Sequence, residues 1–369
     1  MSLRISFEKN PKEPKEARAA RRIGKGISRR EFSSAGLVVA SSLAVPLLLA
    51  QPKPEKSKVV IAVGGKASFY YLPLTIADQL GYFRAEGLDV EIVDFAGGTT
   101  ALQAVQAGSA DVVSGAYEHT INLQSKSQFF QAFVLMGRAP AIALGVSTRT
   151  LPSYKNLGDL RGKKIGVSAP GSSTNMIVSL LLAQAGMKSA DVSFVGVGTG
   201  TSALAAVRSG QIDALSNIDP AMTMLEQKGD VRIICDTRTL KGTTEVFGGP
   251  MPAGCLYAPL DFVKKNPNKA QALTHAIVHS LKWLQTAGPG DLLKTVPEAY
   301  LLGDRGLYLA SFDKVREAIA IDGLIPDDGT KTALRALASF DSTVRADKIA
   351  LATTFTNEFS RRAKERFKA

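Results

Sequence analysis

The sequence predicts an α/β protein built from two similar lobes with parallel or mixed sheets, joined by a hinge that the chain crosses twice, and a helical C-terminus. Three observations carry this prediction. Short apolar runs alternate with amphipathic helical patterns, which is typical of parallel sheets. Part of the pattern recurs 102 residues later, and two extended apolar segments stand where the chain would pass between the lobes.

Composition limits the class of protein, the number of domains and the kind of partner. The 369 residues are 45% hydrophobic and 21% charged, as in a globular protein of about two domains. Of the formal charge of +12, half lies in the first fifty residues. The remainder holds no basic run with interleaved aromatic residues, so nucleic acid is not expected as a partner.

Residues 1–50 predict a signal peptide of the twin-arginine type. A basic stretch ends in Ser28-Arg29-Arg30-Glu31-Phe32, which resembles the consensus S-R-R-x-F, and the apolar run 35–50 is short for a membrane span. Another secretory route and an uncleaved anchor remain as alternatives. No cysteine lies near the junction, so a lipoprotein is not expected. The predicted location is the periplasm.

The first lobe begins with a buried strand and continues as strand and helix in turn. A glycine pair breaks the first strand, and single glycines end the two helices that follow. The expected strands are 59–63, 88–95 and 111–115, and the expected helices are 72–80 and 99–107.

The second lobe repeats this order. Strands are expected at 164–167 and 192–197, with a helix at 172–185 between them. The residues that match at a spacing of 102 are Ala101-Leu102 with Ala203-Leu204, Ala104-Val105 with Ala206-Val207, Gly108 with Gly210, and Asp111 with Asp213. A single repeat of this length indicates two related lobes rather than a solenoid.

Two extended segments, 140–148 and 248–257, are expected to connect the lobes. The predicted division is therefore 58–147 plus 250–369 for a discontinuous first lobe and 150–247 for the second. Helices are expected at 261–287, 312–321 and 346–367.

Three loops offer backbone N–H groups and hydroxyls at the starts of helices, where anions bind readily. In parallel α/β sheets these loops lie at the carboxyl ends of strands, where ligands bind. Plain helix capping is the alternative for any one of them. The candidate ligand-binding residues in these loops are Gly98, Thr99, Thr100, Ser172, Ser173, Thr174, Thr201 and Ser202.

Further candidates follow the other strands. Aromatic side chains would favour an organic ligand, and carboxylates would pair with a ligand ammonium or with the opposite lobe. Exposed caps of the next helices are the alternative for the carboxylates. These candidates are Ser68, Phe69, Tyr70, Tyr117, Glu118, Asn217 and Asp219.

Several motifs together resemble the solute-binding proteins of nitrate/sulfonate/taurine-type ABC transporters. They are Tyr71-Leu72-Pro73-Leu74, Gly81-Tyr82-Phe83 and Glu86-Gly87-Leu88-Asp89-Val90, then Asp159 to Val167, Pro170 to Thr174, and Gly210 to Ala214. The resemblance runs from about Val59 to Cys235. It implies a type II periplasmic binding protein fold.

The same resemblance implies a function without catalysis. A small anionic or zwitterionic solute, such as an alkanesulfonate, taurine or nitrate, would be captured between the lobes and delivered to a membrane permease. A monomer without cofactor or metal is expected. The matched loops hold no Arg that would clamp an anion with two hydrogen bonds, which argues against a strongly charged dianion.

An exported NAD(P)-dependent oxidoreductase is the alternative, because Gly198-x-Gly200-x-x-Ala203 follows a strand and opens a helix. Duplication explains that segment more simply. Hydrolases are not expected, since His275 and His279 lack the Glu of a zinc-protease motif. Cys235 and Cys255 are expected either as one disulfide or as two separate thiols.

Overall fold

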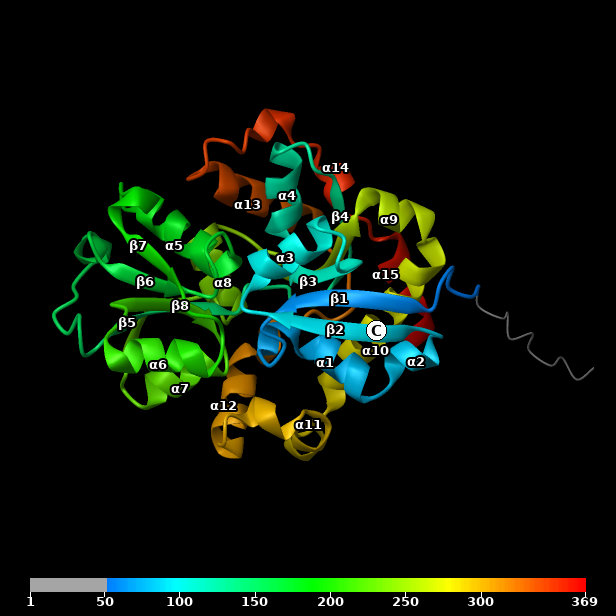
Figure 1. Ribbon diagram of the computed structural model, residues 1–369, viewed down its shortest axis with the longest axis horizontal. Helices are drawn as coiled ribbons and strands as arrows, with labels where there is room; N and C mark the ends of the chain where they lie inside the picture. Colours follow the sequence, from blue (N-terminus) through cyan, green and yellow to red (C-terminus); the bar gives the residue numbers. More distant parts are fainter. Residues whose placement is uncertain (1–51) are drawn as a thin grey trace, which may run out of the picture. The chain divides into compact units, whose positions relative to one another are not determined.

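The computed structural model describes residues 52–369; the predicted signal peptide lies outside the described residues. Gln51–Ala369 forms a compact unit of its own. Its first sheet has the order β2-β1-β3-β10-β4, and its strands β1 and β2 are drawn in blue and cyan in Figure 1. The strands are β1 (Lys58–Gly64), β2 (Asp89–Phe95), β3 (Val112–Ala116), β4 (Phe130–Leu135) and β10 (Gly254–Pro259).

The second sheet has the order β7-β6-β8-β5-β9 and repeats the pattern of the first. Its strands are β5 (Ile142–Ser147), β6 (Lys164–Val167), β7 (Ser193–Gly196), β8 (Ala214–Ile218) and β9 (Val231–Asp236). In each sheet three adjacent parallel strands are followed by an antiparallel strand, β10 in the first sheet and β5 in the second. Each of these antiparallel strands begins after the chain has crossed from the other lobe. The predicted two-lobed α/β class with mixed sheets is confirmed.

The internal repeat has a structural reason at Asp111 and Asp213. The carboxylate of Asp111 accepts the N–H of Val60 at 2.8 Å, and that of Asp213 accepts the N–H of Lys164 at 2.9 Å. Each Asp N–H returns a hydrogen bond to the carbonyl of the same residue. The aspartate thus fixes the start of the third parallel strand against the first in both lobes.

Helices cover the sheets and continue to the C-terminus. Those of the two repeated units are α1 (Leu72–Gln79), α2 (Tyr82–Ala85), α3 (Gly98–Gln106), α4 (Glu118–Ser125), α5 (Ser173–Gln184), α6 (Thr201–Ser209), α7 (Ala221–Gln227) and α8 (Leu240–Phe247). Those after β10 are α9 (Leu260–Lys265), α10 (Pro267–Thr286), α11 (Pro289–Thr295), α12 (Arg305–Val315), α13 (Asp327–Ala338), α14 (Leu351–Thr354) and α15 (Glu358–Phe367). Within residues 52–369, no helix combines the length and apolar character that crossing a membrane requires.

The chain crosses between the lobes at 136–141 and again at 248–253. The two crossings are hydrogen-bonded, because Met136 N–H donates to Gly254 O (2.6 Å) and Ala253 N–H donates to Gly137 O (2.9 Å). The expected first boundary near residue 147 is wrong. β5 pairs with β8 and β9, so 142–147 belongs to the second sheet, because this apolar run is a buried strand there rather than a linker.

Two expected helices are interrupted. The helix expected at 261–287 divides at Asn266, because Pro267 holds the preceding residue outside the helical region (φ −130°, ψ 56°). The helix expected at 346–367 is reduced to short pieces around the extended Phe355, which bridges to Ala132 on β4. The run of Thr and Phe residues at 353–356 favours this extended backbone.

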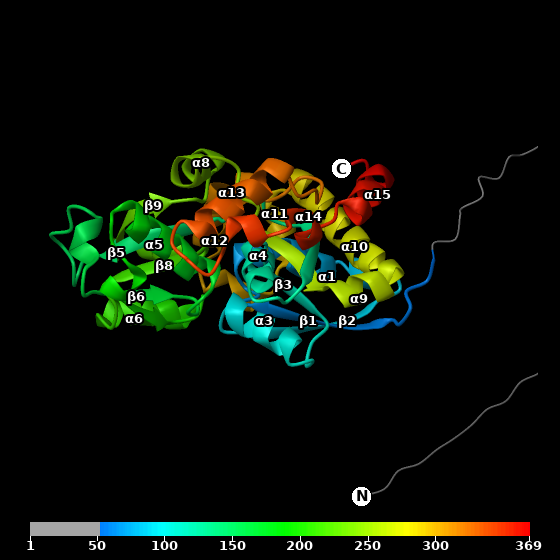
Figure 2. The same ribbon diagram turned by 90° about the horizontal axis from the view of Figure 1, so that it is seen from above.

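The helical C-terminus touches both lobes. Leu307 of α12 is buried in the hydrophobic cluster of the second lobe, and Lys314 Nζ lies 2.8 Å from Glu226 Oε2 of α7. Figure 2 shows α12 beside this lobe, far from α15. α12 begins at Arg305, earlier than the expected Phe312, because Asp304 caps it by accepting the N–H of Leu307.

Candidate functional site

A small cavity lies between the lobes, at the carboxyl ends of the parallel strands, and has a volume of about 20 Å³. Residues from both lobes line it. Those of the first lobe are Gly64, Tyr70, Tyr71, Gly98, Ala116 and His119, and those of the second are Ile142, Ser168, Ser172, Ser173, Thr174, Thr199 and Ile218.

Helix N-termini surround the cavity. Gly98 is the first residue of α3, Ser172 is the N-cap of α5, and Tyr71 is the N-cap of α1. The unpaired backbone N–H groups at such ends carry partial positive charge. Among the described residues that line the cavity, none is Lys or Arg. The partial positive charge that the lining offers is therefore that of the helix N-termini.

Three hydroxyls of the second lobe form a buried network. Ser168 Oγ lies 2.9 Å from Ser172 Oγ and 3.0 Å from Thr174 Oγ1, and the latter two are 2.8 Å apart. Ser172 Oγ also donates to Ala169 O at 2.7 Å, and Thr174 Oγ1 accepts the N–H of Ser168 at 2.9 Å. These bonds hold the start of α5 rigid against the cavity, as pre-organised binding requires.

Glu118 and Ser173 join the lobes. Ser173 Oγ at the start of α5 donates to Glu118 Oε1 at the start of α4, at 2.5 Å. Glu118 is 3% exposed. Burial raises the pKa of its carboxyl to about 7, although the hydrogen bond from Ser173 opposes the rise. The carboxyl therefore changes charge near neutral pH while it bridges the lobes.

His119 adds a neutral imidazole to the cavity wall. Its Nδ1 lies 2.8 Å from the hydroxyl of Tyr257, and its Nε2 is buried without a hydrogen-bond partner. Burial lowers the pKa of His119 to about 4, and Lys126 adds to this effect. The hydroxyl of Tyr70 is likewise buried and unpaired. Buried polar atoms without a partner are costly, and both atoms can hydrogen-bond a group that enters the cavity.

The lobes are closed against each other. A Cβ on Gly65, whose φ is +93°, would lie 2.1 Å from Thr199 Oγ1, and one on Gly97 would lie 2.8 Å from the Cβ of Ala169. The backbone N–H of Phe69 donates to Asp219 O across the interface at 3.0 Å. Glycine is required at Gly65 and Gly97 because the opposite lobe occupies the space of a side chain.

Five predicted site residues line the cavity: Tyr70, Gly98, Ser172, Ser173 and Thr174. Glu118 reaches it through Ser173, and Thr99 lies behind it, where its hydroxyl is buried and unpaired. The other predicted residues lie elsewhere. They are Ser68, Phe69, Thr100, Tyr117, Thr201, Ser202, Asn217 and Asp219.

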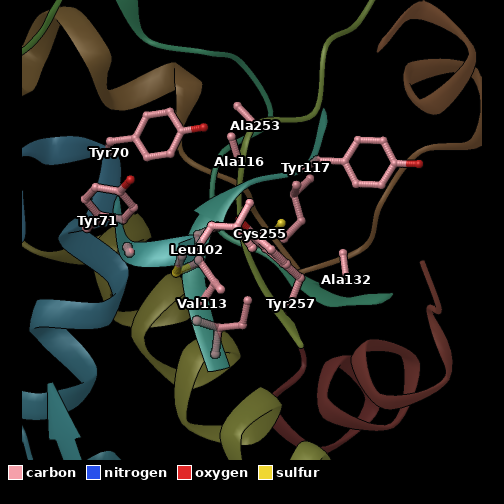
Figure 3. Close-up of a cluster of buried hydrophobic side chains, with 14 of the residues drawn as sticks. Tyr70, Tyr71, Leu102, Val113, Ala116, Tyr117, Ala132, Ala253, Cys255 and Tyr257 are labelled. Atoms are coloured by element: carbon pink, nitrogen blue, oxygen red, sulfur yellow. The ribbon is translucent and has the colours of Figure 1, made fainter. Parts of the chain in front are cut away.

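The aromatic prediction is wrong for two residues. Figure 3 shows Tyr117 directed away from Tyr70 and Tyr71, and its hydroxyl lies 2.7 Å from Thr354 Oγ1. The ring of Phe69 packs against Tyr308 and Phe312, with ring centroids at 4.6 and 5.8 Å. Both rings complete the core between the first sheet and the C-terminal helices, which sequence patterns for the two lobes could not show.

Three of the predicted hydroxyls bond within their own loops. Thr100 Oγ1 accepts the N–H of Gly97 at 3.2 Å and donates to Gly97 O at 2.7 Å, so the capping alternative holds for Thr100. Ser202 donates to Val197 O at 2.6 Å, and Ser68 donates to Gly65 O at 2.7 Å, so these two hydroxyls stabilise their loops without capping a helix. Thr201 is exposed at the start of α6.

Asn217 and Asp219 are buried structural residues. Asn217 Nδ2 donates to Gly198 O at 2.9 Å. The carboxylate of Asp219 accepts the N–H of Thr223 at 2.6 Å and lies 3.5 Å from Arg238 Nη1, so it is already paired with a cation. Only the backbone carbonyl of Asp219 faces the other lobe.

Eight lining residues were not among the predicted ones. They are the apolar Ala116, Ile142 and Ile218, and Gly64, Tyr71, His119, Ser168 and Thr199. Ser168 and Thr199 stand in the hydroxyl-rich loops already recognised, and His119 follows Glu118 directly. The polar residues that follow a strand therefore indicate where the site lies. Which of their side chains faces the cavity depends on the contact between the lobes.

Neither metal nor dinucleotide chemistry gains support. Residues 52–369 contain no group of three or more His, Cys, Asp or Glu residues placed to hold a metal ion. The Gly198–Ala203 segment opens α6, which has nine residues, and its Thr199 packs against Gly65 of the other lobe. Cys235 on β9 and Cys255 on β10 are separate thiols in different sheets.

Two lobes with a hydroxyl-lined cavity between them define the class, which is the periplasmic binding protein fold. The family model described as NMT1/THI5 like matches residues 68–287, and the chain belongs to this family. The resemblance to nitrate/sulfonate/taurine-type binding proteins is confirmed at this level.

Individual relatives agree with this assignment. A solved structure from Bordetella bronchiseptica RB50 is 60% identical, with a TM-score of 0.85, over 86% of this chain and all of that one. A Brucella abortus protein whose name assigns it only a binding role is 27% identical over 63% of this chain and 68% of its own. The alkanesulfonate-binding protein of Xanthomonas axonopodis pv. citri, bound to MOPS, shares the fold (TM-score 0.61, 17% identity, 84% of this chain and 99% of that one).

Proposed function

We propose that this chain captures a small solute between its lobes in the periplasm and delivers it to the permease of an ABC importer. The observation that carries the proposal is the closed cavity, whose walls are hydroxyls and helix N-termini contributed by both lobes. A ligand held by both lobes stabilises the closed state and makes it recognisable to a partner. Export through the segment 1–50 belongs to this proposal.

The cavity favours a zwitterionic or singly charged solute over a dianion. The backbone N–H groups at the starts of α3 and α5 suit one acidic group such as a sulfonate or carboxylate. The hydroxyl hydrogens of Ser172 and Ser173 are already donated to Ala169 O and Glu118 Oε1. No Lys or Arg side chain is among the described lining residues to balance a second charge. Glu118, buried at the lobe junction, suits an ammonium or another hydrogen-bond donor on the same solute. Taurine and related amino sulfonates have this combination.

A binding role is favoured over catalysis by the partners of the lining groups. The serine and threonine hydroxyls of α5 bond to one another, and the imidazole of His119 bonds to Tyr257 rather than to a nucleophile. A nucleophile activated by a general base needs a direct hydrogen bond between the two. Ser173 Oγ and Glu118 Oε1 do make a direct contact, but this bond joins the two lobes, and the relatives are named for binding.

The test is a thermal unfolding screen of the chain from Gln51 with taurine, alkanesulfonates, nitrate, carboxylates and NAD(P). A ligand at 100 times its Kd adds about 2.7 kcal/mol to the stability and raises Tm. The Ser173→Ala variant should lose most of the shift. Ser202→Ala is the matched control, because its hydroxyl bonds Val197 O at the start of α6, away from the cavity.

A shift with one small anion or zwitterion that Ser173→Ala reduces and Ser202→Ala retains would support the proposal. A shift with NAD(P) alone, or equal loss in both variants, would contradict it.

A further inference from the structure

A second, larger cavity adjoins the central one and has a volume of about 370 Å³. It lies between α3 and α4 of the first lobe, α5 of the second lobe and the C-terminal end of α13. His119 lines both cavities. Glu118, whose carboxyl bonds Ser173 of the central cavity, lines the second one. The two spaces therefore have the start of α4 as a common wall.

The walls of the second cavity are apolar near the interior. Leu102, Leu123, Met176 and Leu337 are each less than a tenth exposed, and Phe340 adds a half-buried ring. Met176 comes from the second lobe and the others from the first. The remaining wall carries side-chain amides, the ammonium of Lys126 and the carboxyl groups of Asp341 and Glu118. An apolar group placed there would be enclosed by both lobes.

Two unpaired polar atoms stand at the junction. His119 Nε2 and Thr99 Oγ1 are buried and have no hydrogen-bond partner, and His119 as a whole is only 6% exposed. Thr99 also approaches Gly171 of the second lobe, with its Oγ1 3.5 Å from where a Cβ on Gly171 would lie. Unpaired buried atoms of this kind are expected where a ligand supplies the missing hydrogen bonds.

We infer that the second cavity is a subsite for the tail of the solute. The solute is then elongated, with a polar head in the central cavity, a hydrogen-bonding atom near Thr99 and His119, and an apolar chain or ring among Leu123 and Met176. This inference rests on the proposed function. It adds that the apolar tail, which touches Met176 of one lobe and Leu123 of the other, helps to hold the lobes closed.

The test measures affinity along two series with constant heads, the linear sulfonates from ethanesulfonate to hexanesulfonate and the linear carboxylates from propionate to heptanoate. Burial of each methylene should strengthen binding about fourfold, since about 0.8 kcal/mol is gained per CH₂. Four added methylenes should therefore raise affinity on the order of a hundredfold by isothermal titration calorimetry.

A matched pair of variants tests the location. Met176→Gln places a polar group of similar size in the tail subsite and should flatten the dependence on chain length. Met224→Gln makes the same change at a methionine of similar burial on α7, outside both cavities, and should keep the dependence. Urea unfolding of both variants shows that each is folded at the titration temperature.

The outcomes separate the two proposals. A steep dependence that Met176→Gln alone removes supports the tail subsite. Binding of short members without any dependence on length, or equal flattening in both variants, overturns the tail subsite and leaves the proposed function standing. Binding of no member of either series, nor of any solute in the thermal screen, overturns both.

Discussion

Replacing Glu118 with Gln tests the central electrostatic feature of the site. The carboxyl of Glu118 is enclosed between the lobes, and burial raises its pKa from 4.5 to about 7. Glutamine is close in shape to the protonated acid but cannot ionise. The variant therefore isolates the free-energy cost of charging this one group inside the closed protein.

The magnitude follows from linkage between protonation and folding. Because the folded state binds the proton more tightly than the unfolded state, the contribution of Glu118 to stability is complete below pH 4.5 and is lost as pH rises through 7. A pKa that rises from 4.5 to about 7 corresponds to about 3 kcal/mol. The free energy of unfolding of wild type should thus fall relative to Glu118→Gln by about 3 kcal/mol between pH 4.5 and pH 8.

The effect of Glu118 has to be measured as a difference between wild type and variant, because the neighbouring His119 also changes the free energy of unfolding with pH. Burial lowers its pKa from 6.5 to about 4, so its contribution to stability increases with pH across that interval. The two effects are similar in size and opposite in sign, and they largely cancel in the wild-type curve. The difference between wild type and Glu118→Gln removes the contribution of His119.

The assay is urea unfolding of both proteins, without ligand, at intervals of half a pH unit. Gln103→Asn is the control, because this neutral change on the exposed side of α3 should give a difference that is constant with pH. A constant difference for Glu118→Gln as well would refute the reasoning, because it would mean that the carboxyl is solvated when the lobes close.

Three further outcomes follow from other contacts. Arg238→Met should cost about 3–5 kcal/mol in urea unfolding, because this buried guanidinium neutralises Asp219 and two other carboxylates. Gly65→Ala should weaken solute binding at least about tenfold by calorimetry, and adding Thr199→Gly should restore part of it, because Thr199 occupies the space of the new methyl group. Tyr117→Phe should lower stability by about 1 kcal/mol through loss of the bond to Thr354, with unchanged solute affinity in the same titration.

Much of the fold was predictable because it rests on local patterns. The apolar run of β1, the glycine that ends α1 and the repeated Asp111 and Asp213 each act over short segments. Two strands, β5 and β4, were not predicted from the sequence. β5 looked like a linker because an apolar run does not state which sheet it joins, and β4 gave no separate signal.

The sequence predicted which loops form the candidate site, but not which of their side chains face the cavity or the other lobe. Hydroxyls at helix starts both cap helices and bind ligands, so sequence alone could not separate Ser173, which reaches the other lobe, from Ser202, which bonds its own loop. The same holds for carboxylates: Glu118 faces the lobe junction, whereas Asp219 is neutralised by Arg238, which is 19 residues away in the chain.

The sequence by itself determined the duplicated α/β lobes and the family, since periodicity, glycine stops and motif spacing are properties of neighbouring residues. Only the tertiary structure decided which groups line the cavity and what charge they carry. Both depend on tertiary contacts: Glu118 is buried at the contact between the lobes, His119 Nε2 is buried without a partner, and the C-terminal segment covers Tyr117. Desolvation and contact across an interface are not encoded at any fixed spacing along the chain.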